Sequence, residues 1–244
     1  MIPRVNRSQR RVARMRRDFE RSLAAVEDAL VERFGPEEAA QLAVDARAAF
    51  AKLAPRVPLI RGPRGAMFSG FLAITAQELA AYHALRDHGH PPEEAWAWCN
   101  RALVARLERI PVWRRRFYRA LLRSRLTRAL AARRERLGGV HRIGGFELRF
   151  LAGDDDAFDF GVDYLRCANL EFVMANDGAP FAPYICVSDV ALSEALDWGL
   201  VRTGTLADGC ERCDFRFNPG GPTRISSREP SVQAAIERSE GAFG

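Results

Sequence analysis

The chain has 244 residues, of which 48% are hydrophobic and 28% are charged, and its formal net charge is +6. This composition excludes a mainly disordered chain, because such chains lack the apolar surface that offsets the entropy cost of ordering. No stretch approaches the roughly 20 apolar residues that span a bilayer. The basic start of the chain, residues 1–7, lacks the apolar core of a signal peptide, so we expect a cytoplasmic protein.

Charge divides the chain into two halves. Residues 1–140 carry a net charge of +14 and residues 141–244 a net charge of −8. The basic charge is concentrated in two runs, residues 7–21 and 114–136. Arginines on one helix face can neutralise phosphates, so contact with a nucleic acid or a membrane surface stays open. Both runs also carry a helical apolar stripe, and no nucleic-acid-binding motif accompanies them. We therefore expect solvated helix faces or an acidic protein partner in preference to a nucleic acid.

The spacing of apolar residues predicts helices through the first half. From Val12 to Leu30 they recur every three or four residues, which is one helix face. Gly35-Pro36 ends this helix and begins the next one. The remaining helices of this half, separated by glycines and prolines, are expected over residues 37–53, 67–88, 95–107 and 113–137. Because several of these helices carry apolar stripes, a homo-oligomer is one expectation.

The second half changes to the period of two that is typical of strands. Strands are expected over residues 146–151, 158–164, 200–206 and 213–217, and helices over residues 167–176 and 189–198. The fold class is therefore α+β, with an N-terminal helical layer followed by a small antiparallel sheet with two helices. The expected regions are a basic helical region (1–140), a cysteine-bearing α+β module (141–220) and a mobile tail (221–244).

Four of the five cysteines lie close together in the sequence: Cys167, Cys186, Cys210 and Cys213. Two residues separate Cys210 from Cys213, a knuckle-like spacing that lets two thiolates face one zinc ion. Zinc is therefore the candidate metal, with Cys186, Cys210 and Cys213 as ligands, alone or together with Cys167. Buried thiols and a nucleophilic thiol are the open alternatives, and no cofactor is certain.

Three arginines of the second half are candidates for binding a carboxylate, because a guanidinium group binds it bidentately. They are Arg166, Arg202 and Arg216. If the last two strands pair, Arg202 and Arg216 would project from one face of the sheet. Ion pairs with nearby acidic side chains are the alternative. Asp189 begins a predicted helix, where it would either cap the helix or orient water or a substrate amine.

Three blocks of the second half carry a resemblance in their order: residues 160–172, 183–195 and 200–217. They contain Arg166-Cys167 before a helix, Cys186-x-x-Asp189 at a helix start, Arg202-Thr203-x-Thr205 in a strand and Cys213-Asp214-Phe215-Arg216 in the last strand. This ordered set resembles the L-2-amino-thiazoline-4-carboxylic acid hydrolase family. Ala168 stands where a proline is common in that family, and Cys210 is an additional thiol.

The resemblance implies a hydrolase that opens a small cyclic amidine-like or thiazoline amino acid, acting on a C–N bond. On this reading Cys167 is the nucleophile, and its position at a helix start beside Arg166 would lower the pKa of its thiol. Asp189 or Asp214 would manage protons at the ring nitrogen. The substrate carboxylate would be held by Arg166, Arg202, Thr203 and Arg216. Zinc bound by the cysteines would instead activate water or brace the fold.

A second resemblance points to a different class of protein. A cysteine-bearing α+β module of this kind is also similar to the 4-vinyl reductase domain, which binds small molecules. On that reading the cysteines form a zinc knuckle, the module binds a ligand without turnover, and the basic helical half contacts a partner.

Overall fold

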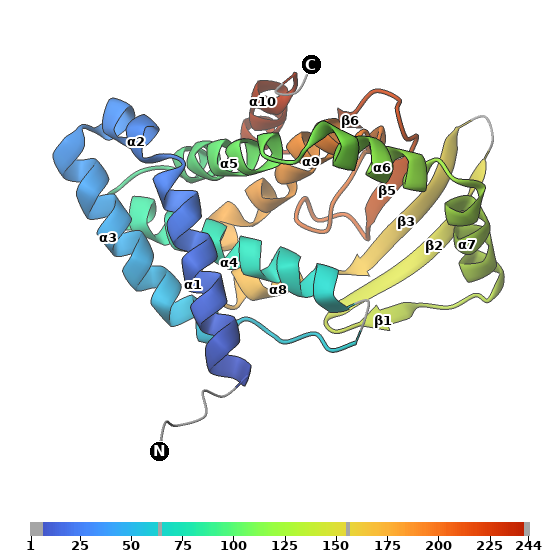
Figure 1. The fold of residues 1–244 in the computed structure, drawn as a ribbon, viewed down its shortest axis with the longest axis horizontal. Coiled ribbons are helices and arrows are strands. Elements are labelled where there is room, and N and C mark those ends of the chain that lie inside the picture. Colours follow the sequence, from blue (N-terminus) through green and yellow to red (C-terminus); the bar gives the residue numbers. More distant parts are fainter. Residues whose placement is uncertain (1–6, 63–64, 155–156, 242–244) are drawn as a thin grey trace. The chain divides into compact units, whose positions relative to one another are not determined.

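The computed structural model describes residues 7–62, 65–154 and 157–241 (Figure 1). The chain forms two compact units. The first contains the residues up to Leu103 together with Phe172–Phe181, and the second contains Val104–Glu171 and Ala182–Gly244. Both units therefore draw on segments that are distant in sequence. The predicted regions 1–140, 141–220 and 221–244 stay a prediction.

The first unit is helical. Its helices are α1 (Arg7–Ala24), α2 (Glu27–Phe34), α3 (Pro36–Leu53), the 3₁₀ turn η1 (Ala54–Arg56), α4 (Gly65–Asp87) and the first part of α5 (Pro92–Glu108). The core lies between α3 and α4, where Leu42, Leu72 and Leu79 are fully buried. This confirms the helices predicted over residues 37–53, 67–88 and 95–107.

Two helices that the apolar spacing predicted as continuous are each divided. The helix expected to continue from Val12 to Leu30 breaks at Ala25–Val26, where the Val26 amide bonds the Leu23 carbonyl three residues back. Val26 stays buried across this tight turn, so the apolar spacing continues through the break. The helix expected over residues 113–137 is divided into α6 (Val112–Leu122) and α7 (Arg125–Arg136). There the Ser124 hydroxyl accepts a hydrogen bond from the Thr127 amide at 3.2 Å and caps the start of α7.

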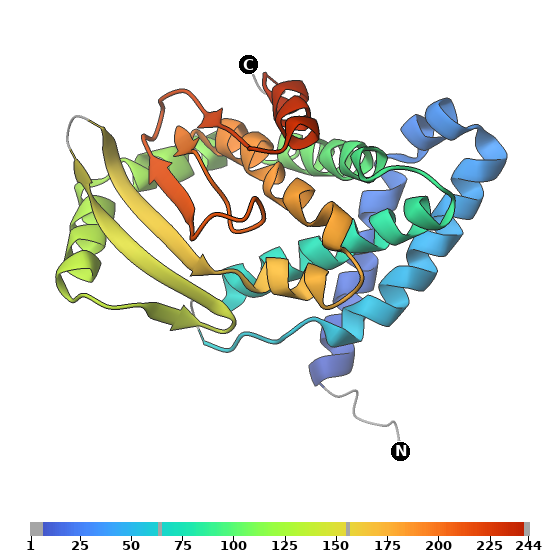
Figure 2. The ribbon, with the colours of Figure 1, turned by 180° about the vertical axis from the view of Figure 1, so that it is seen from behind.

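A six-stranded sheet forms the centre of the second unit (Figure 2). Its strands are β1 (His141–Ile143), β2 (Phe146–Asp154), β3 (Phe158–Arg166), β4 (Leu200–Arg202), β5 (Cys213–Phe217) and β6 (Arg224–Ile225). The order is β1-β2-β3-β5-β4-β6, and every pairing is antiparallel except that of β4 with β6. The α+β class is confirmed, with the helical layer N-terminal to the sheet.

Short helices follow the strands of the second unit and cover its core. They are α8 (Ala168–Met174, which continues into the first unit), the 3₁₀ segment η2 (Ala179–Cys186, which begins in the first unit), α9 (Ser188–Leu196) and α10 (Pro230–Ser239). The segment predicted as a mobile tail supplies β6 and α10. Val232, Ala235 and Ile236 of α10 are buried, so this part of the chain adds to the core of the unit.

No helix in the part of the chain that the structure describes is long and apolar enough to cross a membrane. This confirms the expected lack of a membrane span within those residues. The basic start of the chain, on which the predicted cytoplasmic location depends, lies almost entirely outside the described residues. The location therefore stays a prediction.

Candidate functional site

A cluster of thiols and charged groups lies where β3 and β5 meet the helices that follow. The register pairs Tyr164 of β3 with Cys213 of β5. Three residues after Tyr164, the chain leaves β3 and places Cys167 directly before α8. Charge on Cys167 raises the pKa of Tyr164, Cys186 and Cys213, so the fold has brought these four residues close together. We call these residues, together with Asp189 and Arg202, the thiol cluster.

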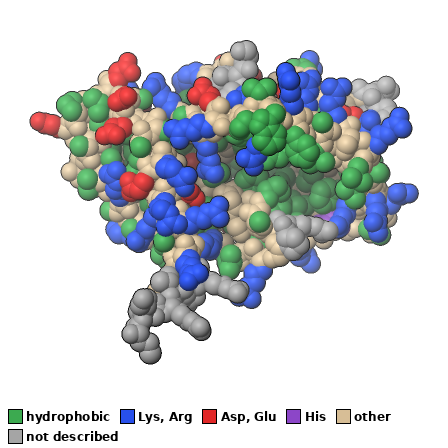
Figure 3. Space-filling view, viewed as in Figure 1, with side chains coloured by type: hydrophobic (Ala, Val, Ile, Leu, Met, Phe, Trp, Pro, Cys, Tyr) green, Lys and Arg blue, Asp and Glu red, His purple; other side chains and the backbone are tan. Residues whose placement is uncertain are grey.

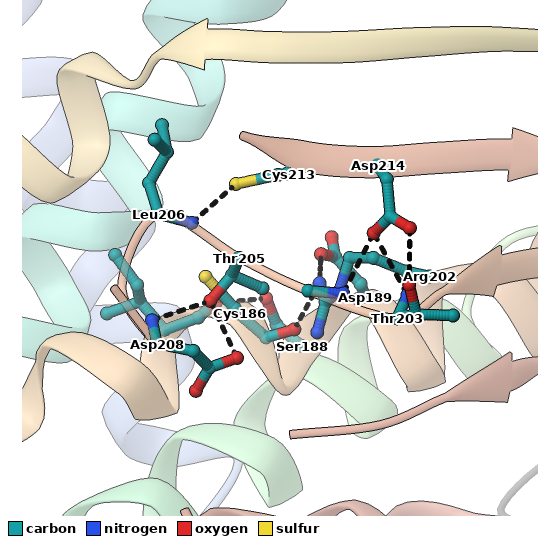
Figure 4. Close-up of polar contacts among 12 residues, drawn as sticks. Cys186, Ser188, Asp189, Arg202, Thr203, Thr205, Leu206, Asp208, Cys213 and Asp214 are labelled. Atoms are coloured by element: carbon teal, nitrogen blue, oxygen red, sulfur yellow. Dashed lines mark hydrogen bonds and ion pairs between the residues drawn. The ribbon is translucent and has the colours of Figure 1, made fainter. Parts of the chain in front are cut away.

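An ion pair between Asp189 and Arg202 forms the charged part of the thiol cluster (Figure 4). Arg202 is only 2% exposed, and its Nη1 donates hydrogen bonds to Asp189 Oδ2 and, at 3.0 Å, to the Cys186 carbonyl. The alternative in which Asp189 caps a helix is wrong. The N-cap position of α9 is Val187, and no side chain caps it, because Asp189 lies inside the first turn and reaches Arg202.

The guanidinium of Arg202 keeps a donor that the protein does not use. Its Nε is buried and has no hydrogen-bond partner in the described residues. The guanidinium carbon lies 5.6 Å from the centre of the Phe215 ring, which packs against the cation. A buried donor without a partner is costly, so this Nε is a candidate contact for an acceptor group.

Burial raises the pKa of all three thiols in the cluster. It raises the pKa of Cys213 to about 12 and that of Cys186 well above its usual range. For Cys167, backbone amides of Leu170 and Asn169 bond the sulfur and lower its pKa, but burial acts more strongly and the net shift is upward. The expectation of a lowered pKa for Cys167 is therefore wrong, since its desolvation outweighs the helix-start amides.

Arg166 does not supply the positive charge that was expected beside Cys167. Its side chain is exposed and turned to Glu171, with Nη2 3.0 Å from Oε2 of that carboxylate. The Arg166 charge is therefore paired with Glu171 at the surface. The pKa of Cys167 depends on burial, on the backbone amides and on two carboxylates, Asp189 and Glu171, whose negative charges raise it further.

The two arginines expected on one face of the sheet lie on opposite faces. Val201 is paired with Arg216, so Arg202, one residue further along the strand, projects to the other side. Arg216 instead forms an ion pair with the buried Asp163 at 2.9 Å. The hairpin was predicted, but the expected shared face is wrong, because side chains alternate along each strand and the two arginines are out of phase.

Asp214 organises the loop after β4. Its carboxylate accepts hydrogen bonds from the Thr203 amide at 2.9 Å, the Thr203 hydroxyl at 2.6 Å and the Gly204 amide at 2.8 Å. An open pocket of about 350 Å³ lies beside this loop. The pocket is lined by Thr203, Gly204, Gly209, Cys210, Glu211, Arg212, Asp214 and Arg228. The hydrogen-bonded pair Asp214 and Thr203 therefore forms part of the pocket wall.

The described residues do not assemble the predicted zinc site. Among residues 7–62, 65–154 and 157–241, no three His, Cys, Asp or Glu side chains are placed to hold one metal ion. Cys210 lines the open pocket, and a Cβ at Gly204 would come within 2.8 Å of its sulfur. The Cys213 sulfur instead accepts a hydrogen bond from the Leu206 amide at 3.2 Å (Figure 4).

Two residues of this region escaped the sequence reasoning. Tyr164 is paired with Cys213, and burial raises the pKa of its phenol. Asp163 is 4% exposed and lies 3.5 Å from Arg212 as well as close to Arg216. The alternation Asp159, Gly161, Asp163 in a predicted strand was a usable signal, because it places carboxylates on one face.

Comparison with known proteins bears on the same region. No curated protein and no solved structure matches the chain. One family model, described as L-2-amino-thiazoline-4-carboxylic acid hydrolase, matches residues 68–217. The match covers more than half of the chain and includes every member of the thiol cluster. The chain therefore belongs to the L-2-amino-thiazoline-4-carboxylic acid hydrolase family.

Proposed function

We propose that this protein hydrolyses a small cyclic amidine-like amino acid of the 2-amino-thiazoline-4-carboxylate type. One observation carries the proposal beyond the family name. Cys167, Asp189 and Arg202 come from three separate blocks of the sequence, yet Asp189 forms an ion pair with Arg202 and its charge raises the pKa of the half-buried Cys167. Together they offer a nucleophile, a base and a cation, which are the groups that opening a charged heterocycle requires.

The electrophile of such a ring is the carbon between nitrogen and sulfur. In the proposed reaction the Cys167 sulfur adds to this carbon, the ring C–N bond breaks, and the ring nitrogen leaves as an amine after accepting a proton. Water then adds to the same carbon and releases Cys167, so that the product is the substrate plus one water molecule. It carries a free amine and a carbamoyl group on its sulfur.

Asp189 is proposed to move the proton. The raised pKa of Cys167 keeps the thiol protonated at neutral pH, so the nucleophile needs a base. Burial raises the pKa of Asp189, which makes it a stronger base than an ordinary carboxylate, while Arg202 limits that rise. The carboxylate can accept the thiol proton and pass it to the ring nitrogen.

Arg202 is proposed to bind the substrate carboxylate through the donor that it does not use within the protein. Its Nη1 is occupied by Asp189 and Cys186, whereas Nε has no partner in the described residues. Arg216 lies on the other face of the sheet, and Arg166 is exposed and bonded to Glu171. We therefore retain Arg202 from the predicted substrate-binding set.

A binding module without turnover is the second candidate. The observation that favours it is the raised pKa of Cys167, Cys186 and Cys213, because protonated thiols are poor nucleophiles. The two candidates differ in one measurable property. An enzyme holds one thiol that a bound substrate or base can activate, whereas a module holds thiols that stay unreactive with ligand present.

The decisive experiment incubates the full chain with L-2-amino-thiazoline-4-carboxylate and follows the reaction by mass spectrometry. We expect a product heavier by one water molecule. Cys167→Ser and Asp189→Asn should each reduce kcat by about a hundredfold or more. Cys99→Ser, the same change at a thiol of the first unit, is the matched control and should keep full activity.

The same preparation should be assayed for zinc, because the cysteine spacing predicted that metal. Binding of the substrate without any product would move the assignment to the binding module. Full turnover by Cys167→Ser would refute the proposed nucleophile, while turnover itself would still support the hydrolase.

A further inference from the structure

The exposed surfaces of α6 and α7, which we together call the α6–α7 face, combine apolar and basic side chains. Of the thirteen large hydrophobic side chains that are exposed among the described residues, eight lie within residues 112–140. Trp113 is 69% exposed, Leu126 62% and Leu137 67%. The same segment holds ten arginines and only one acidic residue, Glu135. Figure 3 shows hydrophobic and basic side chains interleaved over the positions of both helices.

The apolar side chains form a stripe on each helix. Trp113, Phe117 and Leu121 are four residues apart on α6, so they lie along one side of it. On α7, Leu126 and Leu130 are also four residues apart. We call these five side chains the apolar stripe. An exposed stripe of this kind, rimmed by charge, is typical of a surface that contacts a partner.

Both helices are attached to their own unit by other side chains. On α6, Arg119 Nη1 lies 3.3 Å from Asp197 Oδ2. On α7, Ala131 is buried, and Arg128 Nη1 lies 3.2 Å from Asp159 Oδ1 on β3. Other side chains attach each helix to the unit, and the apolar stripe remains exposed outside the core.

Several arginines beside the stripe have no partner among the residues that the structure describes. Arg116, Arg123, Arg125 and Arg133 are exposed and form no side-chain hydrogen bond or ion pair with the described residues. This surplus of positive charge selects an anionic partner. It also opposes pairing with a second copy of the chain, because a symmetric interface would place arginines against arginines.

We propose that the α6–α7 face binds to the surface of an anionic lipid membrane. An interfacial helix buries Trp, Phe and Leu at the boundary of the acyl chains and directs its arginines to anionic headgroups. The indole of Trp113 suits this boundary, because its apolar ring carries one polar N–H group. A nucleic acid would use the arginines but would leave the apolar stripe exposed to water.

The α1 helix provides a comparison within the same chain. It is also rich in arginine, but its apolar residues Met15, Phe19 and Leu23 are buried in the core of the first unit. The exposed Arg10 and Arg17 therefore offer positive charge without an apolar stripe. A purely electrostatic attraction would treat the two helices alike, whereas the proposed surface needs the α6–α7 face.

The test is sedimentation of the full chain with vesicles of phosphatidylcholine, with and without phosphatidylglycerol. We expect binding to the anionic vesicles, weakening as salt is raised. Arg116→Gln/Arg123→Gln should lower the partition coefficient about fivefold for each arginine. Arg10→Gln/Arg17→Gln changes the net charge equally and should lower it far less.

Tryptophan emission reports insertion directly. Of the four tryptophans, Trp96 and Trp98 are buried and Trp198 is half-buried against Phe217, whereas Trp113 is 69% exposed. A lipid-induced shift of the emission to shorter wavelength should therefore come mainly from Trp113. Trp113→Phe should remove most of the shift while keeping most of the binding, and brominated lipids should quench the wild-type emission.

Three outcomes would overturn the proposal. The first is the absence of sedimentation with anionic vesicles, and the second is an equal loss in the α1 and α6–α7 arginine variants. The third is burial of Trp113 through self-association or through binding to DNA when no lipid is present. None of these readouts depends on the proposed hydrolase activity.

Discussion

Replacing Arg202 with methionine tests directly whether Asp189 and Arg202 form a buried ion pair that stabilises the fold. Arg202 is 2% exposed, and it is the counter-charge of Asp189, whose side chain is 19% exposed. The substitution leaves a largely buried carboxylate without its cation and the Cys186 carbonyl without its donor. Removing one partner of a buried ion pair costs about 3–5 kcal/mol, so we expect a loss of that size in the free energy of unfolding.

The double variant Arg202→Met/Asp189→Asn should recover part of this loss, because it removes both charges. We expect a coupling energy of about 1–3 kcal/mol from the thermodynamic cycle. The measurement is urea unfolding followed by circular dichroism and by tryptophan emission. Arg228→Met is the control, since Arg228 is exposed and forms no side-chain hydrogen bond or ion pair with the described residues. It should change stability by less than about 0.5 kcal/mol.

The stability lost on Arg202→Met should also depend on pH, which tests the buried ion pair independently. Burial already raises the pKa of Asp189, and loss of Arg202 should raise it further. A carboxyl group with a raised folded-state pKa stabilises the fold below its unfolded pKa, and this contribution is lost as pH rises through the folded value. The Arg202→Met variant should therefore fall further below the wild type at pH 8 than at pH 5. A loss under about 1 kcal/mol that does not vary with pH would refute a buried ion pair.

Three further changes test other parts of the second unit. Burial raises the pKa of Cys213 from its ordinary value of 9.0 to about 12 in the folded protein. The wild type should therefore lose about 1.4 kcal/mol of stability per pH unit above pH 9 relative to Cys213→Ser. An equal alkaline loss in both proteins, measured by urea unfolding at pH 9 and 10.5, would contradict this. Asp214→Ala removes three hydrogen bonds to Thr203 and Gly204, so it should cost about 1–3 kcal/mol and speed hydrogen exchange at the Gly204 amide. Unchanged exchange there would show that the loop does not depend on this carboxylate. Ser124→Ala removes the N-cap of α7 and should lower the free energy of unfolding by about 1 kcal/mol, measured by urea unfolding. Ser124→Asp keeps a side chain that can cap the helix and should retain most of the wild-type stability.

The elements and the fold class could be predicted from local patterns. Helical spacing located α3, α4 and α5, and alternation located β2, β3 and β5, because local chain geometry sets both periods. The two divided helices escaped because their breaks keep the apolar spacing and contain neither glycine nor proline. At Ser124 the capping hydroxyl was the one available signal.

The ordered blocks of the second half also identified the family from sequence alone, and they made Cys167, Asp189 and Arg202 candidate site residues. Their relations were decided only by the tertiary structure. Because Val201 pairs with Arg216, Arg202 and Arg216 lie on opposite faces of the sheet, although pairing of the two strands had predicted a shared face. Packing also places the Asp189 carboxylate against Arg202 and not at the start of a helix. For Cys167, the helix-start amides that lower its pKa could be foreseen from local sequence, but the burial that outweighs them could not. Burial depends on residues distant in the chain, and only the folded sheet and its helices bring those residues around the thiol.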